Sequence, residues 1–381
     1  MSGCLLCLSV VSVSCGGNQQ RVATALDTSS ADSVVQLDYA HGFTIRQSGG
    51  TTFVSVLNPW QGAHDKEFCY ALCPKDAPLP EGLSGYTVIR TPVERVICLS
   101  TTHVAMLKAL GRTSSIKALS GSAFVYDADI QKAVADKMIP DVGYDTALDF
   151  EKIIALKPDA VFAYGVGQEV LGSLTKLTDL GIKVVLNAEY LEQTALGKAE
   201  WLKFMATFYR CEAEAAVLFE NIKQEYESLK LLAANEKNKP KIMCDLPWKG
   251  TWYIPGGKTS IAEIIADAGG DFLWKENDSH ESYPVDIEAI IDKGALADLW
   301  IHTGTARSLY EIKSVDERLA HARPWKTGNV FNNYARTSAG GGNDFFESGV
   351  IQPQVVLKDL IKIFHPDLLP NHSLYYYVKL N

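Results

Sequence analysis

The stretch that most constrains the fold lies in the middle of the chain, at residues 212–235. It reads EAEAAVLFENIKQEYESLKLLAAN and contains neither Gly nor Pro. Its apolar positions recur every three or four residues, as on one face of a helix. These positions are Phe219, Ile222, Tyr226, Leu229 and Ala233. At about 1.5 Å per residue the helix would be about 36 Å long, which exceeds most helices inside one lobe. The sequence therefore predicts one long helix with a single buried stripe.

Segments on both sides of this helix alternate strands with helices, which is typical of α/β architecture. Two of these units, residues 149–165 and 286–302, share one plan. Each begins with Asp at an expected helix cap, carries Glu two residues later and an Ile-Ile pair, and ends in a short turn and a buried strand. We therefore predict an α/β fold in which two Rossmann-like lobes are bridged by one long helix.

The region ahead of the first lobe has a different texture. Residues 34–90 contain the segments VVQLDYA, FTIRQ, TTFVSVLN and EFCYAL, which are β-branched or aromatic and are separated by Gly, Pro or Asn. They predict a small β-rich N-terminal extension. The expected organisation is a signal peptide with its lipobox at 1–15, a flexible tether at 16–33, the extension at 34–90, an N-terminal α/β lobe at 91–198, linking helices at 199–238 and a C-terminal α/β lobe at 239–381.

The first residues suit an export signal. An uncharged apolar run from Leu5 to Val13 is too short to span a bilayer but fits the core of a signal peptide. Val13-Ser14-Cys15 resembles a bacterial lipobox, in which the Cys is lipidated, although Ser12 stands where Leu is usual and no basic residue precedes the core. The alternative is a buried N-terminal helix or strand. The polar tether after Cys15 favours lipidation at that residue.

Charge and cysteine content exclude several classes. The chain has 36 Lys and Arg against 45 Asp and Glu, a net charge of −9, and no basic run of the kind that binds nucleic acid. After the leader no stretch approaches the roughly 20 apolar residues of a membrane span, so membrane contact is expected through the lipid anchor only. Beyond Cys15 the cysteines form no zinc motif, and we expect no essential disulfide.

Four blocks carry a family resemblance. ERVICLSTTHVAMLKALG, IPDVGY with the unit that begins at Asp149, LTKLTDLGIKVVLN and WYIPGGKTSIAEIIADAGG occur in that order. In order and spacing they resemble the periplasmic binding proteins of ABC importers for cobalamin, haem and ferric siderophores, over residues 91–370. The extension and the block GKAEWLKFMATFY resemble a Bacteroidetes-type lipoprotein subgroup.

This resemblance implies a non-enzymatic, monomeric carrier with no intrinsic cofactor. The bridging helix would be rigid, and a carried metal chelate (cobalamin, haem or ferric siderophore) would lie in the cleft between lobes that close little. The partners would be an ABC permease and, through it, the ATPase subunits. The location would be the periplasm of a Gram-negative bacterium, with the protein lipid-anchored to a membrane.

The family also implies one docking glutamate on each lobe, and by motif these fall on Glu151 and Glu288. Each follows the Asp of the duplicated unit in the first helical turn, where the helix dipole favours an exposed carboxylate. The alternative is that both are ordinary charges at helix N-termini.

Ligands of such folds meet the loops at the carboxyl ends of the strands, and these loops are rich in aromatic residues that suit a broad, flat ligand. Arg336 could pair with a carboxylate, and His103 or His280 could reach the metal through the chelate or merely cap a helix and line the cleft. The run SAGGGNDFFES after Arg336 is expected to form a mobile loop beside the cleft. The predicted ligand-binding residues are Thr101, Thr102, His103, Phe124, Tyr126, Tyr144, Asp145, Tyr164, Trp248, Trp252, Tyr253, His280, Ser282, Thr303, Tyr334 and Arg336.

Two alternatives stay open. A zinc or manganese carrier would need about three or four ligands from both lobes, which His103, His280 and an acidic residue could supply. A two-lobed metallo-hydrolase is the enzyme alternative. The segment GGKTS from Gly256 is not a phosphate loop, because Trp252 stands where that motif needs its first Gly.

Overall fold

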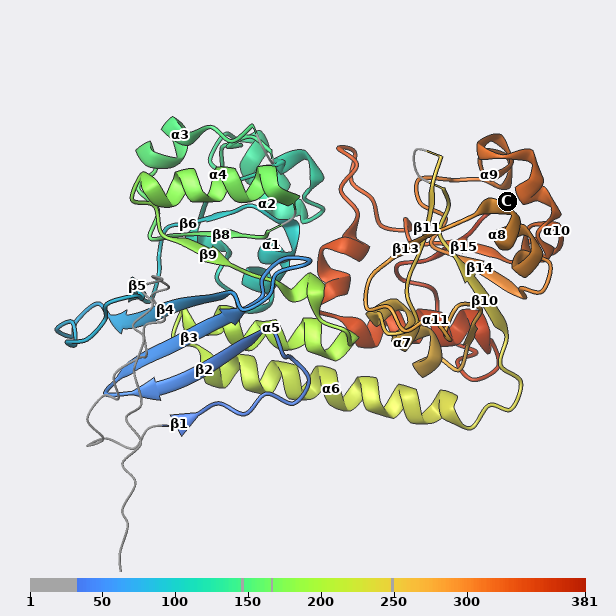
Figure 1. Cartoon of the computed structure of the whole chain (residues 1–381), viewed down its shortest axis with the longest axis horizontal. Coiled ribbons are helices and arrows are strands. Elements are labelled where there is room, and N and C mark those ends of the chain that lie inside the picture. Colours follow the sequence, from blue (N-terminus) through green and yellow to red (C-terminus); the bar gives the residue numbers. More distant parts are fainter. Residues whose placement is uncertain (1–32, 145–146, 166, 248–249) are drawn as a thin grey trace, which may run out of the picture.

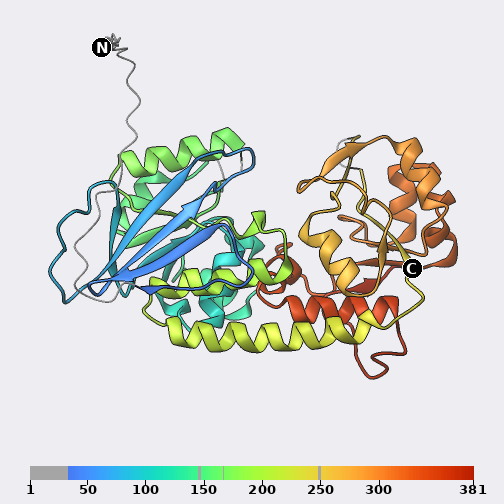
Figure 2. The same ribbon diagram turned by 60° about the horizontal axis from the view of Figure 1, so that its bottom comes forward.

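The computed structural model describes residues 33–144, 147–165, 167–247 and 250–381. Two α/β lobes lie side by side, and one long helix runs beneath both (Figure 1). A separate sheet from the start of the described chain covers one side of the N-terminal lobe (Figures 1 and 2). The predicted two-lobed α/β class with a β-rich extension is confirmed.

The N-terminal lobe is built on a parallel four-stranded sheet with the order β7-β6-β8-β9. Its central strands β6 and β8 are apolar and buried at every position, as expected for a sheet covered on both faces. The strands are β6 Val96–Cys98, β7 Ile116–Leu119, β8 Ala160–Ala163 and β9 Val184–Leu186, and the helices are α1 Thr101–Ala109, α2 Ala128–Ala135, α3 Phe150–Ala155 and α4 Gly167–Asp179.

The C-terminal lobe repeats this plan with the order β12-β10-β14-β15-β16, in which only β16 runs antiparallel to its neighbour. A two-stranded ribbon of β11 and β13 stands beside it. The strands are β10 Lys241–Cys244, β11 Trp252–Ile254, β12 Asp271–Phe272, β13 Tyr283–Val285, β14 Leu299–Ile301, β15 Val330–Asn332 and β16 Val378–Lys379, and the helices are α7 Ser260–Asp267, α8 Ile287–Gly294, α9 Leu309–Val315, α10 Arg323–Thr327 and α11 Pro353–Phe364.

Helices α5 (Ala195–Thr207) and α6 (Glu212–Ala234) join the lobes. The long helix is therefore confirmed, and it spans both lobes in Figure 1. All five apolar positions of the predicted stripe are among its buried residues. Short 3-10 turns complete the connections: η1 Thr113–Ser115, η2 Ser122–Phe124, η3 Glu189–Leu191, η4 Glu317–His321, η5 Asp344–Phe346 and η6 Ser348–Val350.

The duplicated unit forms α3 with β8 in one lobe and α8 with β14 in the other. The two caps differ. Asp149 accepts a hydrogen bond from the backbone N–H of Lys152, whereas Asp286 precedes α8 without a side-chain cap bond. The first helix of the N-terminal lobe is capped by Ser100, whose side chain accepts from the backbone N–H of Thr102.

The extension is a five-stranded sheet, β1 to β5 in sequence order, antiparallel except for the β4–β5 pair. Of the expected strand VVQLDYA only Val34 lies in a strand, as the second residue of β1, because part of the following backbone has other partners. The N–H groups of Asp38, Tyr39 and Ala40 donate to the buried carboxylate of Glu200 at 2.8–3.2 Å. The strands are β1 Ser33–Val34, β2 Phe43–Ser48, β3 Thr51–Leu57, β4 Glu67–Pro74 and β5 Thr87–Thr91.

Replacing Glu200 with Ala is expected to destabilise the protein by about 3 kcal/mol, because three backbone donors and the Lys203 ammonium, 2.6 Å away, lose their acceptor. Urea unfolding measures the change. The exposed Glu214 of α6 is the control, and its Ala variant should shift stability by less than about 0.5 kcal/mol. Equal effects of the two variants would contradict a structural role for Glu200.

In the described part of the chain, no helix is both long and apolar enough to cross a membrane. The five cysteines of that part, Cys69, Cys73, Cys98, Cys211 and Cys244, are free thiols.

Candidate functional site

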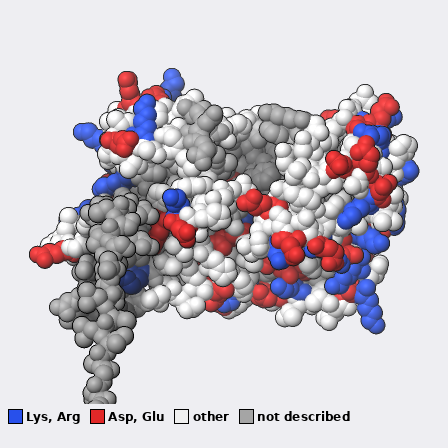
Figure 3. All heavy atoms as spheres, viewed as in Figure 1, with Lys and Arg blue, Asp and Glu red and all other residues white. Residues whose placement is uncertain are grey.

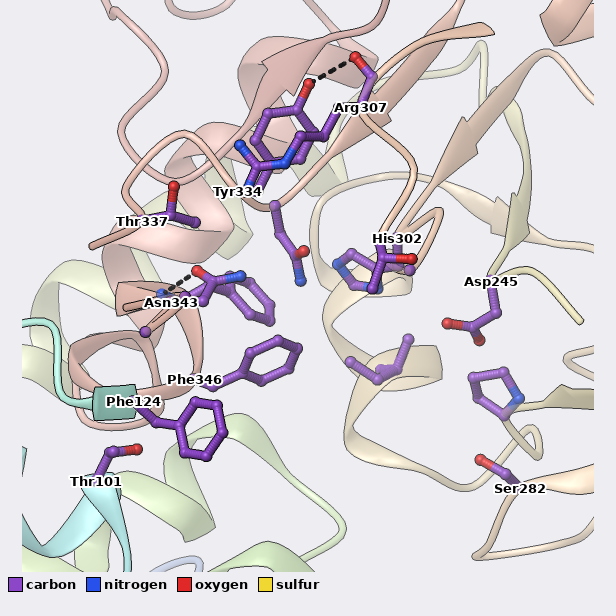
Figure 4. A pocket seen from close by; sticks show the side chains of 18 of the residues that line it. Thr101, Phe124, Asp245, Ser282, His302, Arg307, Tyr334, Thr337, Asn343 and Phe346 are labelled. Atoms are coloured by element: carbon purple, nitrogen blue, oxygen red, sulfur yellow. Dashed lines mark hydrogen bonds between the residues drawn. The ribbon is translucent and has the colours of Figure 1, made fainter. Parts of the chain in front are cut away.

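A cavity of about 780 Å³ lies between the lobes at the carboxyl ends of their strands. Its size is in the range typical of small-molecule and cofactor sites. The N-terminal lobe supplies Thr101 at the start of α1, Phe124 at the end of η2, and Tyr144. The opposite wall comes from the C-terminal lobe: from the loops after β10, β11, β14 and β15, the start of α7 and the residue before β13 (Figure 4). That wall comprises Asp245, Pro255, Ile261, Ser282, His302, Gly304, Thr305, Arg307, Asn333, Tyr334, Thr337, Gly341, Gly342, Asn343, Phe345 and Phe346.

Five of the wall residues are Phe or Tyr, and they come from both lobes. The side chains of Phe124, Tyr144 and Phe346 are 49%, 48% and 58% exposed although they lie in a cavity. Phe124 packs against Tyr144 with their ring centroids 5.6 Å apart, and Phe124 and Phe346 both point into the open space (Figure 4). Solvent-exposed apolar surface gathered in one concave place marks a binding site, because leaving it in water costs free energy.

His302 supplies a neutral imidazole to the cavity wall. Its Nε2 is 2.6 Å from the hydroxyl of Tyr377, and its ring stacks on that of Tyr377 and lies against Phe345. Burial lowers the pKa of His302 to about 4, so the ring is uncharged near neutral pH. On the same wall, burial raises the pKa of Asp245 to about 7. A neutral ring and a carboxyl group with a raised pKa place less charge on this wall than ordinary His and Asp side chains would.

Arg307 is the cation of the cavity wall. Its guanidinium lies over the ring of Tyr334 at 4.9 Å, and the Tyr334 hydroxyl donates to the Arg307 carbonyl at 3.0 Å. Stacking on Tyr334 orients the cation without neutralising it. This side chain can therefore meet an acidic group on a ligand.

The glycine-rich loop of residues 337–343 leaves the C-terminal lobe and seats on the N-terminal lobe. Thr337 and Asn343 form an antiparallel bridge, and the Ser338 N–H donates to the Gly342 carbonyl at 2.7 Å. A Cβ added at Gly340 would lie 2.4 Å from the Ala123 carbonyl oxygen, and one at Gly342 would lie 2.3 Å from that of Phe124. These close approaches seat the loop against the N-terminal lobe.

Glu347 links the lobes just beyond this loop. Its buried carboxylate accepts from the backbone N–H of Tyr126 at 2.6 Å and of Asp127 at 3.1 Å. Both donors belong to the N-terminal lobe, so one side chain ties the two lobes together behind the cavity.

The stability of the protein should depend on pH through Glu347. Burial raises its pKa to about 7, so between about pH 4 and 7 the native state binds more protons than the unfolded state. The stabilisation that comes from the protonated Glu347 carboxyl is present at low pH and is lost as the pH rises through about 7. We expect the free energy of unfolding to fall by about 1 kcal/mol between about pH 6 and pH 8 from this group, and Glu347→Gln to remove that part of the change.

Urea unfolding at about pH 6 and pH 8 measures the change in the free energy of unfolding. Glu276→Gln, at an exposed position, is the control. Burial also raises the pKa of Asp245, so Asp245 adds to the same fall in stability with pH. The part due to Glu347 is the difference in pH dependence between Glu347→Gln and the unaltered chain. An unchanged pH dependence in Glu347→Gln would contradict this account.

The structure brings several of the predicted ligand-binding residues together. Thr101, Phe124, Tyr144, Ser282 and Tyr334 line the main cavity. Tyr164 lines a smaller adjoining cavity whose wall also includes Thr101, Phe124 and Tyr144. Tyr253 and Ser282 line a further hollow beside Asp245.

Arg336 and Tyr126 lie elsewhere, in a separate cavity of about 730 Å³ that shares Thr337 with the main one. The Arg336 Nε donates to Asp344 at 2.6 Å, and its guanidinium lies 4.9 Å from the Tyr126 ring and 4.1 Å from that of Tyr375. This arginine already has a carboxylate partner, whereas Arg307 faces the cleft.

The other predicted contacts do not lie in the cavity wall. His103, Trp252 and Thr303 are buried in the lobe cores, and Trp252 stacks on Trp300 with centroids 6.0 Å apart. Thr102 pairs with Ser100 at the start of α1, and His280 is exposed outside the cavities. His103 packs near Phe162, with neither ring nitrogen hydrogen-bonded, and burial lowers its pKa to about 3. Asp145, Trp248 and Cys15 lie outside the described residues.

Glu151 and Glu288 are both exposed in the first turns of α3 and α8. Glu288 pairs with Arg318 at 3.1 Å. On the face shown in Figure 3, acidic and basic side chains are interspersed over the outer parts of the lobes. Both glutamates are therefore accessible to a partner protein.

Sequence reasoning missed Asp245, Phe345 and Phe346 as wall residues. The signal for Asp245 was its position directly after a buried strand, where a parallel sheet presents its ligand loops. Phe345 and Phe346 follow the glycine run, and two adjacent aromatics in a loop expected beside the cleft were the available sign. Within the described ranges, no group of three or more His, Cys, Asp or Glu residues is arranged to hold a metal ion.

Comparison with known proteins gives a family and a fold. Residues 96–332 match the family described as periplasmic binding protein. An uncharacterized lipoprotein of Methanocaldococcus jannaschii is 26% identical over 99% of this chain and 95% of its own length.

Two solved structures share the fold at low sequence identity. The periplasmic haem-binding protein RhuT of Roseiflexus sp. RS-1, in its apo form, is 18% identical with a TM-score of 0.56, over 72% of this chain and 99% of that one. The periplasmic vitamin B12 binding protein BtuF of Vibrio cholerae is 15% identical with a TM-score of 0.52, over 74% and 99% of the two chains.

Proposed function

The chain belongs to the periplasmic binding protein family, and from this membership we propose that it captures an iron or cobalt chelate and delivers it to the permease of an ABC importer. The family is one of binding proteins, so the hydrolase alternative is set aside. The observation that carries the ligand class is the open cavity between the lobes, walled by Phe124, Tyr144, Tyr334 and Phe346. Broad aromatic walls suit the apolar faces of a corrin, a porphyrin or a catecholate chelate.

The charges of the site fit the same ligand class. Arg307 at the cavity wall suits a propionate, phosphate or carboxylate on the periphery of the chelate. The neutral His302 suits an uncharged ring or a bound metal rather than a free anion. The solved structures of similar fold include proteins named for haem and for vitamin B12, which supports a ligand of this kind without choosing between the two.

We further propose that the protein works outside the cytoplasmic membrane, held there by a lipid on Cys15. A full-length relative named as a lipoprotein supports the anchor. That relative is archaeal, so it lends no support to a Gram-negative periplasm or to a Bacteroidetes subgroup. Cys15→Ser should move the chain from the membrane fraction to the soluble fraction, and continued membrane retention would contradict the anchor.

Thermal unfolding with a ligand panel tests the ligand class. The mature chain is mixed separately with haemin, cyanocobalamin, ferric siderophores and zinc, since a ligand that binds the native state raises the melting temperature by mass action. We expect a rise with at least one chelate and none with zinc. A rise with zinc alone would replace the proposal with the zinc or manganese carrier.

A further inference from the structure

The β3–β4 loop of the extension, residues 58–66, lies close to the cleft. In Figures 1 and 2 this end of the sheet points toward the gap between the lobes, and the β4–β5 connection, residues 75–86, lies at the opposite end. The extension is therefore placed so that one of its loops can take part in the binding site.

Internal hydrogen bonds give this loop a fixed shape. The Asn58 N–H donates to the Lys66 carbonyl at 2.8 Å, and the Lys66 N–H donates back to the Asn58 side-chain oxygen at 3.0 Å. Within the loop the Ala63 N–H donates to the Trp60 carbonyl at 3.0 Å. Its side chains are thus held in place before any ligand arrives, which lowers the entropy cost of a contact.

The loop is fastened to the cleft segment that follows β8. A Cβ added at Gly165 would lie 3.3 Å from the Pro59 carbonyl oxygen and 3.4 Å from the Trp60 Cβ, so the two segments touch. The Tyr190 hydroxyl donates to the Gly165 carbonyl at 2.6 Å and lies 3.5 Å from that of Pro59. One hydroxyl thus bridges the extension and the cleft segment.

Gly165 directly follows Tyr164, which lines the smaller cavity beside the main one. Thr101, Phe124 and Tyr144 line both cavities, so the wall that they share extends to Tyr164, whose neighbour Gly165 touches the loop. Across the gap, Glu281 of the C-terminal lobe is near enough to help raise the pKa of Tyr190, after burial and the charge of Glu189. The loop therefore reaches the side of the N-terminal lobe that faces the C-terminal lobe.

Aromatic surface is available at this place. The half-buried Trp60 meets the ring of Phe68 edge-on with centroids 5.8 Å apart, and Phe68 is 36% exposed. Gln61 and His64 at the tip are exposed.

We infer that residues 58–66 form a third wall of the ligand cleft, in which Trp60 contacts the outer edge of the bound chelate. This inference rests on the proposed function. It gives the β-rich extension a role that the two lobes alone do not reveal: the extension widens the aromatic wall for a ligand that projects beyond the main cavity.

Equilibrium titration of the mature chain with haemin and with cyanocobalamin tests the inference. Trp60→Ala should raise the Kd of the bound chelate about fivefold, since one aromatic contact is lost. Trp60→Leu, which keeps apolar packing near Gly165, should also raise the Kd of the chelate. This variant tests the contact even if Trp60→Ala folds poorly. Leu79→Ala in the β4–β5 connection, 51% exposed at the other end of the sheet, is the control and should leave the Kd unchanged.

An unchanged Kd in folded Trp60→Leu would overturn the inference. Unchanged affinity together with lost uptake in the same variant would also overturn it, and would place the loop at the contact with the permease. Both results leave the proposed function standing, because the unaltered chain still binds. Failure of the unaltered chain to bind haemin, cyanocobalamin and every ferric siderophore of the panel would overturn the proposed function and this inference together.

Discussion

Reversing the charge of both Glu151 and Glu288 is expected to abolish import of the chelate while leaving its affinity for the protein unchanged. The two carboxylates are exposed in the first turns of α3 and α8, one on each lobe. Neither lines the cavity. If basic residues of the permease bind them, two arginines at these positions would create like-charge contacts that cost several kcal/mol at the interface.

The experiment compares uptake and binding in one set of proteins. Glu151→Arg with Glu288→Arg is assayed for import of the radiolabelled chelate through the cognate permease, and for its Kd in solution. Glu214→Arg with Glu225→Arg on α6, which runs along the opposite side of the molecule (Figure 1), is the matched control of equal charge change. Normal import by the first double variant would contradict docking through these residues.

A side chain at Gly342 is expected to weaken chelate binding at least about tenfold, which corresponds to about 1.4 kcal/mol. A Cβ there would lie 2.3 Å from the backbone carbonyl oxygen of Phe124, and a backbone atom cannot move aside as a flexible side chain would. Gly342→Val must therefore lift the loop off the N-terminal lobe. Because the loop and Phe124 both belong to the cavity wall, that movement reshapes the site.

Gly328, at the end of α10 and outside the cavity wall, provides the control that separates this clash from backbone strain. Its φ of +67° disfavours any side chain, but a Cβ there has no atom within 4 Å. Gly328→Ala should cost some stability and leave affinity nearly unchanged. Titration of both variants measures the difference, and equal Kd values would show that the seat of the loop on the N-terminal lobe does not shape the site.

The fold could be predicted from the sequence where local patterns and packing agree. The stripe from Phe219 to Ala233 has a helical period and no breaker, and its residues are buried in α6. The segment after Val34 shows the opposite case. Its alternating residues suit a strand, but the Glu200 carboxylate, distant in sequence, binds its N–H groups instead. No local pattern contains that partner.

The cavity wall could be predicted only as a set of loops. The rule that parallel strands present ligands at their carboxyl ends led to Thr101, Phe124 and Tyr144, which line the cavity. The same rule cannot say which way a side chain turns, and His103 and Trp252 turn into the cores. For Arg336 the sequence could not show that its guanidinium already has a carboxylate partner. The path of the glycine-rich loop brings Asp344 beside it.

The most direct measurement is a crystal structure of the mature chain grown with haemin or cyanocobalamin, with data collected at the absorption edge of the metal. We predict one strong anomalous peak for iron or cobalt in the cavity between Phe124 and His302, with the ring system of the ligand against the aromatic walls. A peak in another place, such as the cavity beside Arg336, would contradict the account, and so would an unoccupied cleft in crystals grown at saturating chelate.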